Sequence, residues 1–262
     1  MRYALIALVA LTVSAYGQNV ICKTATVVDG GHRIDQDTNG KRTIEPESTF
    51  TNSVLKQTFS YSDNSDADFY DLSAAGNDGA QTNANSQPTF SSANGGVYDF
   101  DGIDDYINLG ASLQSVLNNK SFSISAWFKT TVTGWTILDC REYNNDDEVR
   151  FYPNAMAYDE DAVGVVYATI SSTNTHDGAW HHSVGTVSAS TASLYLDGVL
   201  VASSDASGSG TLTLDDDVFI GARGGNSRDG YFDGIIDDVR IYTRALTSNE
   251  VMTVYNNTSG AH

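Results

Sequence analysis

The sequence predicts an all-β protein, a two-sheet antiparallel sandwich or jelly roll with one short C-terminal helix. Many short segments rich in β-branched and aromatic residues are separated by turn-forming residues. Over residues 121–130 the apolar residues Phe122, Ile124, Ala126 and Phe128 share one face and Ser121, Ser123 and Ser125 the other, which is typical of a strand with one face in a core. Only residues 247–255 have a clear helix signature.

The strands follow one another through most of the chain. In the clearest segment Phe122, Ile124, Ala126 and Phe128 share one face. Asp197-Gly198, between two apolar runs, supplies the positive φ angles that a two-residue hairpin turn needs. The other segments that we expect to form strands are 20–28, 55–61, 97–100, 106–109, 135–139, 149–152, 163–170, 182–187, 192–196, 199–203, 211–214, 218–222 and 234–242.

The C-terminal helix is predicted from its first turn. Thr247 and Glu250 have the spacing of a capping box, in which each side chain accepts a hydrogen bond from the other residue's backbone. The helix that follows, to about Tyr255, places Val251 and Val254 on one side.

The N-terminal region has a different character. One positive charge at Arg2, an apolar run over residues 3–13 and small residues up to Gly17 are typical of a secretory signal peptide over residues 1–17. Cleavage after Ala15, or retention as an anchor, are the alternatives. We therefore expect a secreted, extracellular protein. Residues 18–52 are expected to form an N-terminal strand and a polar linker, and residues 53–258 a single domain.

The charge of the chain restricts its partners. It has 33 Asp+Glu against 14 Lys+Arg, a formal net charge of −19. Nucleic acids and anionic membrane surfaces both attract Lys and Arg, so neither is an expected partner. Surplus carboxylates suit hard cations such as calcium.

The two cysteines, Cys22 and Cys140, are predicted to form a disulfide, because an exported chain meets an oxidising environment and the count is even. Two unpaired thiols are the alternative. Neither cysteine belongs to a Cys-x-x-Cys pair, so zinc and redox functions are not indicated.

Six motifs in order resemble the laminin G-like jelly roll of the concanavalin A-like lectin/glucanase superfamily. They cover about 200 residues, and their most specific members are FDGIDDYI at 100–107 and FDGIIDDVRIY at 232–242; the others are at 70–79, 125–128, 180–184 and 194–198. The resemblance implies the fold. It leaves the function open, because this fold includes lectins, adhesion modules, glycosidases and lyases.

Calcium is one cofactor that the resemblance implies. Members of this superfamily often hold a structural calcium between an acidic residue near the first strand and an Asp in the last one. Asp237 matches the late position, Asp63 roughly matches the early one, and Asp71 is a further candidate. The alternative is that these carboxylates are solvated or cap turns.

Trp127, Trp180 and the pair His181-His182 are interpreted as structural. The tryptophans lie in or next to strands, where core packing is more common than sugar stacking. Adjacent histidines on a strand point to opposite faces and cannot easily share a ligand.

No catalytic motif is found. The Glu-x-Asp-x-x-Glu strand of laminarinase-like members is absent, as are the Gly-x-Ser-x-Gly elbow and His-Glu-x-x-His. We therefore expect a protein that is not an enzyme.

The leading hypothesis is a non-catalytic recognition module that binds a glycan, matrix or cell-surface ligand through loops at one rim. Two loops carry suitable side chains for hydroxyl hydrogen bonding and stacking, namely Tyr143 and Asn145 in one, and Arg223, Asn226, Arg228 and Tyr231 in the other. Two alternatives remain open. One is a structural subunit of a fibre or surface layer that self-assembles through its N-terminal segment. The other is a divergent polysaccharide hydrolase or lyase.

Overall fold

The computed structural model describes residues 24–28, 32–36, 42–46, 53–57, 68–69, 77–81, 83–91, 97–141, 147–159, 166–169, 174–188, 191–206, 212–224 and 229–262. The chain divides into two compact units, Met1–Thr51 and Asn52–His262. The predicted signal peptide, residues 1–17, lies outside the described residues.

The described part of the first unit is a small antiparallel sheet of strands β1 (Thr24–Val28), β2 (His32–Gln36) and β3 (Arg42–Pro46). The sequence predicts one strand and a polar linker in this region, so strands β2 and β3 were not predicted. Each has a single isoleucine, too few apolar residues for a period-two pattern. Their pairing follows from backbone register, in which Ile34 lies opposite both Thr26 and Ile44.

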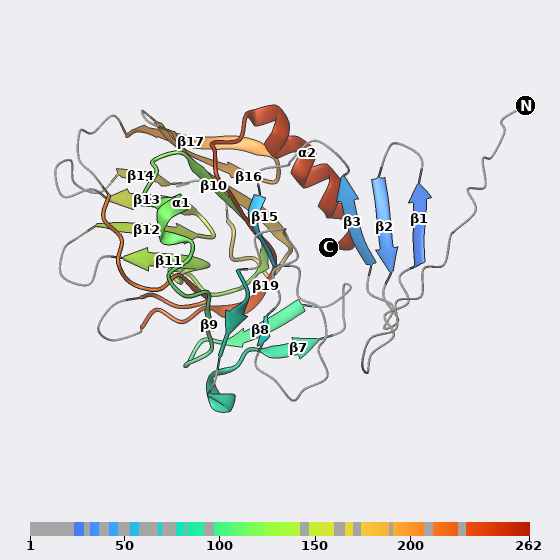
Figure 1. The fold of residues 1–262 in the computed structure, drawn as a ribbon, viewed down its shortest axis with the longest axis horizontal. Helices are drawn as coiled ribbons and strands as arrows, with labels where there is room; N and C mark the ends of the chain where they lie inside the picture. Colours follow the sequence, from blue (N-terminus) through green and yellow to red (C-terminus); the bar gives the residue numbers. More distant parts are fainter. Residues whose placement is uncertain are drawn as a thin grey trace, which may run out of the picture. The chain divides into compact units, whose positions relative to one another are not determined.

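The second unit contains two antiparallel sheets of eight strands each, counted over its described residues (Figure 1). Sheet 1 has β10 near its centre and β17 and β7 at its ends, and β4 also pairs with β19. Its strands, in spatial order, are β17 (Val199–Asp205), β16 (Thr191–Leu196), β15 (His181–Ser188), β10 (Phe122–Lys129), β19 (Asp233–Tyr242), β8 (Val97–Asp101) and β7 (Thr89–Ser91), with β4 (Ser53–Gln57).

Sheet 2 faces sheet 1 and is built mostly from the middle of the chain. Its strands, in spatial order, are β14 (Val166–Thr169), β13 (Ala155–Asp159), β12 (Glu148–Tyr152), β11 (Leu138–Arg141), β18 (Phe219–Ile220), β9 (Ile107–Asn108), β6 (Gly79–Ala80) and β5 (Asp68–Phe69). The expected all-β, two-sheet antiparallel sandwich is confirmed.

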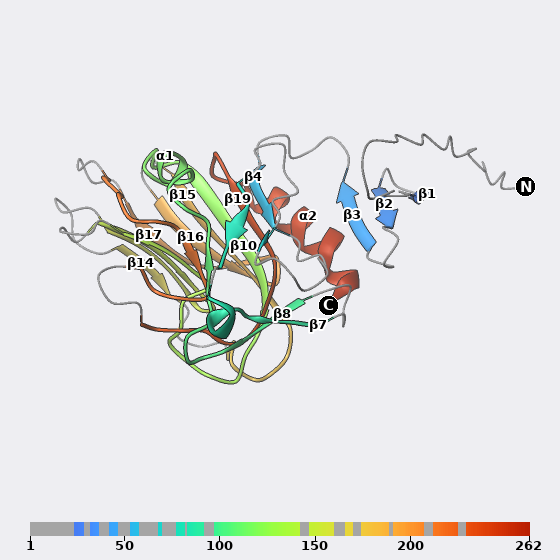
Figure 2. The same cartoon turned by 60° about the horizontal axis from the view of Figure 1, so that its bottom comes forward.

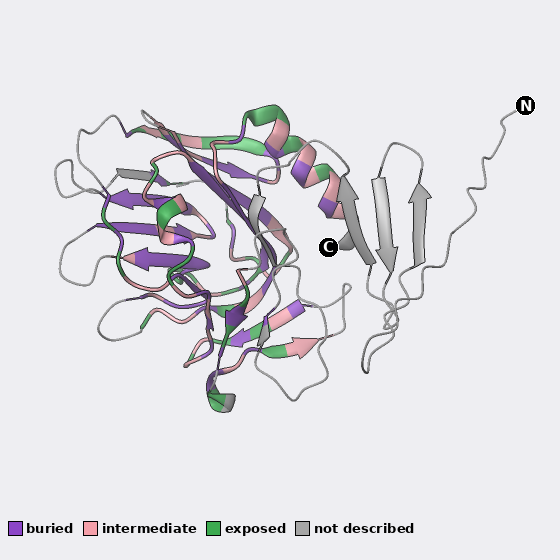
Figure 3. Cartoon of the chain, in the orientation of Figure 1, coloured by how far each residue is buried: buried purple, intermediate pink, exposed green. Residues whose placement is uncertain are grey.

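The core lies between the sheets and uses the alternation seen in the sequence. Phe122, Ile124, Ala126 and Phe128 are fully buried and belong to one apolar cluster, which also contains Leu138 from sheet 2. Figure 3 shows that β10 and the facing strands β11 to β13 are mostly buried. Neighbouring residues on these strands point away from the core, to the outer face of each sheet.

The local predictions at the hairpin and the helix are also confirmed. Asp197 and Gly198 join β16 to β17 with φ angles of 49° and 80°. Helix α2 (Ser248–Thr258) begins with the capping box of Thr247 and Glu250, and it lies on the outer side of sheet 1 (Figure 2).

Some short elements differ from the prediction. Residues 212–214, the described part of the strand expected over 211–214, are not a strand, and three short helical elements, α1 (Gln114–Leu117), η1 (Ala84–Ser86) and η3 (Ser259–Ala261), were not predicted. Each is a single turn, too short to produce a periodic sequence signal. Within the described residues no helix is long and apolar enough to cross a membrane.

Candidate functional site

Five residues from the loops at one end of the central strands β11 and β18 of sheet 2 form a surface cluster. We call it the rim cluster; its members are Trp135, Arg223, Asp229, Gly230 and Tyr231. Trp135 comes from the loop between β10 and β11, and the other four come from the loop between β18 and β19. The indole of Trp135 is 37% exposed, whereas Trp127 is buried at 4%. Large exposed aromatic side chains commonly mark binding surfaces.

A backbone bridge joins the two parts of the β18–β19 loop that belong to the rim cluster. Arg223 and Asp229 form an isolated antiparallel bridge, and the N–H of Arg223 donates to the carbonyl of Asp229 at 3.0 Å. Gly230 follows with φ of +61°, a conformation that favours glycine.

Gly230 also separates the two larger side chains. A Cβ atom added at Gly230 would lie 3.4 Å from Cβ of Arg223 and 3.6 Å from Cε3 of Trp135. The glycine therefore lets the loop backbone pass close to both the arginine and the indole.

The ion pair of the rim cluster, between Arg223 and Asp229, is long and exposed. Nη1 of Arg223 lies 3.6 Å from Oδ1 of Asp229, and the side chains are 40% and 61% exposed. This distance is too long for a good hydrogen bond, and exposed ion pairs contribute little stability. Both groups are accessible to a ligand.

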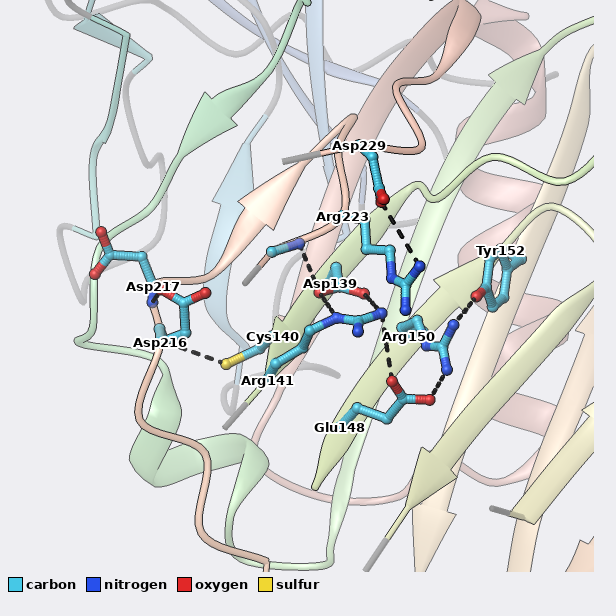
Figure 4. A network of polar contacts seen from close by, with 11 residues as sticks. Asp139, Cys140, Arg141, Glu148, Arg150, Tyr152, Asp216, Asp217, Arg223 and Asp229 are labelled. Atoms are coloured by element: carbon cyan, nitrogen blue, oxygen red, sulfur yellow. Dashed lines mark hydrogen bonds and ion pairs between the residues drawn. The ribbon is translucent and has the colours of Figure 1, made fainter. Parts of the chain in front are cut away.

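A network of buried polar side chains contacts the β18–β19 loop on its inner side (Figure 4). Asp139 lies on the outer face of β11 with no exposed surface. Its Oδ1 accepts from the backbone N–H of Gly224 at 2.8 Å and from Nε of Arg141 at 2.9 Å. Because Gly224 follows Arg223, the carboxylate of Asp139 fixes the start of the rim loop.

The network continues onto β12. Arg141 also contacts Glu148 at 3.3 Å, and Glu148 forms a second ion pair with Arg150. Arg150 donates to the hydroxyl of Tyr152 at 2.8 Å. Alternation along β11 and β12 puts these polar residues on one face and Leu138, Cys140, Val149 and Phe151 in the core.

Burial raises the pKa of Asp139, and the Arg141 guanidinium and the Gly224 N–H offset part of that increase. Each carboxylate of the network therefore has a cationic partner, as buried charges require. We interpret the network as a support that holds the rim cluster in one geometry.

Four of the predicted ligand-binding residues, Tyr143, Asn145, Asn226 and Arg228, lie outside the described residues. The other two, Arg223 and Tyr231, belong to the rim cluster, and Tyr231 is half-buried.

Sequence reasoning missed Trp135 as a member of the rim cluster. Trp135 was expected to begin a strand over residues 135–139, but β11 begins at Leu138. Gly134, with φ of +91°, breaks the extended run before Trp135. Asp229 and Gly230 belong to the loop that the sequence indicated, but the pairing of Asp229 with Arg223 depends on a bridge that the sequence does not reveal.

The predicted calcium ligands give a mixed result. Asp63 and Asp71 lie outside the described residues. Asp237 is buried in β19, where its Oδ2 is 2.9 Å from Nε2 of His262 and its Oδ1 accepts from the N–H of Asp238 at 2.7 Å. Both its oxygens thus have a protein partner in the structure. Calcium binding remains a prediction.

Carboxylates of the FDGIDDYI motif lie within 4.8 Å of one another, at Asp101, Asp104 and Asp105. Their oxygens accept from the turn itself: Asp101 from the N–H of Ile103, and Asp105 from the N–H of Asp101. These bonds hold the turn that follows β8, so the Asp side chains have a structural role in this motif.

Cys140 is a free, fully buried thiol in the structure, and its Sγ donates to the carbonyl of Asp216 at 3.4 Å. Cys22 lies outside the described residues. The predicted Cys22–Cys140 disulfide therefore remains a prediction.

Trp127 and the histidines have structural roles, as expected. Trp127 stacks on His262 at 4.4 Å between ring centroids, and its Nε1 donates to Oγ1 of Thr258 at 2.7 Å. His182 packs beside the same indole, and burial lowers its pKa to about 3. His181 points to the other face and contacts Asp197 at 2.9 Å. These contacts attach α2 and the C-terminal residues to sheet 1.

Comparison with solved structures shows the same fold at low sequence identity. Domain 4 of AbnA, a GH43 extracellular arabinanase from Geobacillus stearothermophilus solved in complex with arabinotriose, is 19% identical, with a TM-score of 0.58, and covers 78% of this chain and 98% of its own. The botulinum neurotoxin serotype G binding domain (17%, TM-score 0.59) and the binding domain of Paraclostridial Mosquitocidal Protein 1 (14%, TM-score 0.60) cover 79% and 78% of this chain. This chain spans about half of each of those two, 51% and 52%.

No curated protein sequence matches this chain. A family model does match it, over residues 100–252, which is more than half of its length. Together with the two-sheet fold, this match shows that the chain belongs to the Laminin_G_3 family of the concanavalin A-like lectin/glucanase superfamily.

Proposed function

We propose that this protein is a secreted, non-catalytic recognition module that binds glycans through the rim cluster. One observation carries the proposal: the exposed residue Trp135 lies beside an exposed donor–acceptor pair, Arg223 and Asp229. The loop that carries this pair is held in place by the buried carboxylate of Asp139.

The chemistry of these groups suits a sugar. An aromatic face packs against the C–H groups of a sugar ring, while convergent polar groups fix its hydroxyls. A loop fixed before binding costs little ordering entropy, which raises affinity.

The structural comparisons support this proposal. The arabinanase domain was solved with arabinotriose, and the two toxin fragments are described as binding domains. Those descriptions belong to proteins less than 20% identical to this one, so they support a binding function without identifying a ligand.

The described carboxylates near the rim cluster argue against hydrolysis. A glycosidase needs two carboxyl groups that reach the scissile bond. Asp139 has no exposed surface, and Glu148 is buried between Arg141 and Arg150. Asp229 is the exposed carboxylate of the rim cluster, and neither of these two buried groups can act with it as the second carboxylate.

The test is glycan binding by the purified chain from residue 18 onward, first on a glycan array and then by titration calorimetry with the best oligosaccharide. We expect Trp135→Ala to weaken binding at least about tenfold, since truncating an aromatic residue that anchors a partner costs roughly 2 kcal/mol or more. Ile103→Ala, at an exposed apolar residue in another loop, is the matched control and should bind like the wild type.

Two results would contradict the proposal. One is the absence of binding to any arrayed glycan. The other is release of reducing ends from a bound polysaccharide, which would show an enzyme.

A further inference from the structure

The rim cluster presents one cation and one anion side by side, and both are exposed. Nη1 of Arg223 and Oδ1 of Asp229 are 3.6 Å apart, longer than a good hydrogen bond. The backbone bridge between the same two residues keeps this spacing defined. Arg223 can only donate, and ionised Asp229 can only accept.

We infer that the rim cluster selects an uncharged sugar unit with two neighbouring hydroxyl groups. One hydroxyl accepts a hydrogen bond from Arg223, the next donates to Asp229, and a C–H face of the ring stacks on Trp135. This inference rests on the proposed glycan-binding function and specifies the chemistry of its ligand.

The balance of charge favours a neutral ligand over an acidic one. Arg223 and Asp229 cancel each other, and the two arginines below them, Arg141 and Arg150, already pair with Asp139 and Glu148. An acidic sugar would meet no unpaired cation among these residues. It would also approach a chain with a net charge of −19, which repels anions.

Gly230 keeps the surface between Arg223 and Trp135 free of a further side chain. A single methyl group at this position would already be in van der Waals contact with both residues. A sugar ring that lies over the glycine can therefore approach the arginine and the indole together.

The experiment compares neutral and acidic oligosaccharides on the same protein. The probes are arabino-, xylo- and cello-oligosaccharides and, as the acidic arm, oligogalacturonate, each titrated at low and high salt. We expect binding of at least one neutral probe, at least about tenfold weaker binding of the uronate, and little salt dependence, because no net charge is neutralised.

Two substitutions test the donor and the acceptor separately. Asp229→Asn and Arg223→Gln should each weaken the neutral probe at least about fivefold, since each removes a charge-assisted hydrogen bond. Asp229→Asn should also reduce discrimination against the uronate. Asp205→Asn and Lys129→Gln, at exposed charged positions of sheet 1, are the matched controls and should leave affinity unchanged.

A direct readout locates the ligand. The chain has three tryptophans, and Trp127 and Trp180 contact His262. In an NMR titration the neutral probe should shift the indole N–H signal that disappears in Trp135→Phe and leave the other two in place. Thermal melting of each variant confirms that it is folded.

The outcomes are distinguishable. Preferential, salt-sensitive uronate binding overturns the inference but leaves glycan recognition intact. Neutral binding that survives both rim substitutions, or that leaves the Trp135 signal unmoved, also overturns it. Failure of every glycan to bind removes the proposed function itself.

Discussion

The pKa of Asp105, a residue of the FDGIDDYI motif, depends on the residues around it. It is buried in the turn after β8, where Asp101 and Asp104 lie close by. Burial, together with the nearby carboxylates of Asp101, Asp104 and Asp99, raises its pKa to about 6, although the hydrogen bond from the Asp101 N–H acts to lower it. The folded protein therefore holds a proton here in a pH range where the unfolded chain has lost it.

This difference predicts a pH dependence of stability. Since the pKa of Asp105 is about 6 in the folded state and 3.8 as its ordinary value, the free energy of unfolding should fall as pH rises between these values. We expect Asp105→Asn, which is neutral throughout, to stabilise the protein by about 1 kcal/mol at pH 7, after allowance for solvent screening, and to change it little at pH 4.

Urea unfolding of both proteins at the two pH values measures this effect. The asparagine oxygen can still accept the bond from the N–H of Asp101, which Asp105 accepts at 2.9 Å. A variant that is less stable at pH 7 would show that the ionised carboxylate helps the turn.

Helix α2 depends on contacts at both of its ends. At its start, Arg244 donates to both oxygens of Glu250 at 2.8 and 2.7 Å, and Glu250 also accepts from the N–H of Thr247. These hydrogen bonds lower the pKa of Glu250 to about 2. At its end, Thr258 and His262 pack on Trp127. The helix is therefore attached to sheet 1 by polar and aromatic contacts as well as by Val251 and Val254.

The contacts at the start of α2 predict an acid-sensitive stabilisation. Because the pKa of Glu250 is lower in the folded state than its ordinary 4.5, its contribution is present above about pH 4.5 and is lost as pH falls towards 2. We expect Glu250→Gln to destabilise the protein by about 1 kcal/mol at pH 7, a value that allows for its partial exposure. The difference from the wild type should shrink at pH 3.

Denaturant unfolding at pH 7 and pH 3 tests this prediction. Asn249→Gln, at the neighbouring exposed helix position, is the control. An equal loss at both pH values would indicate that the ion pair with Arg244 is not the source of the stabilisation.

At the scale of the whole molecule, the two units of the chain predict that binding belongs to the second. The rim cluster, its buried support and the core all lie within Asn52–His262. We expect a chain beginning at residue 52 to bind the same glycan with affinity within about twofold of the chain beginning at residue 18, because none of the described contacts at the site involves the first unit.

Size-exclusion chromatography of the same two chains tests the fibre alternative. In the described residues of the first unit, β1 to β3 pair with one another. We therefore expect both chains to elute as monomers. A larger species that disappears on truncation would instead indicate assembly through the N-terminal segment.

The sequence alone determined the parts of this protein that depend on neighbours along the chain. The alternation of Phe122 to Phe128 sets which face of β10 enters the core, Asp197-Gly198 sets a turn, and Thr247 with Glu250 begins a helix. Each involves residues a few positions apart, whose geometry the local backbone fixes.

Only the tertiary structure decided the candidate site. Trp135 meets Gly230, and Asp139 meets Gly224, because the pairing of β11 with β18 brings together two loops that are distant in the sequence. Asp237 meets His262 for a similar reason, since α2 returns the chain end to sheet 1. Loop side chains have no period that reveals their direction, so their partners depend on how the sheets pack.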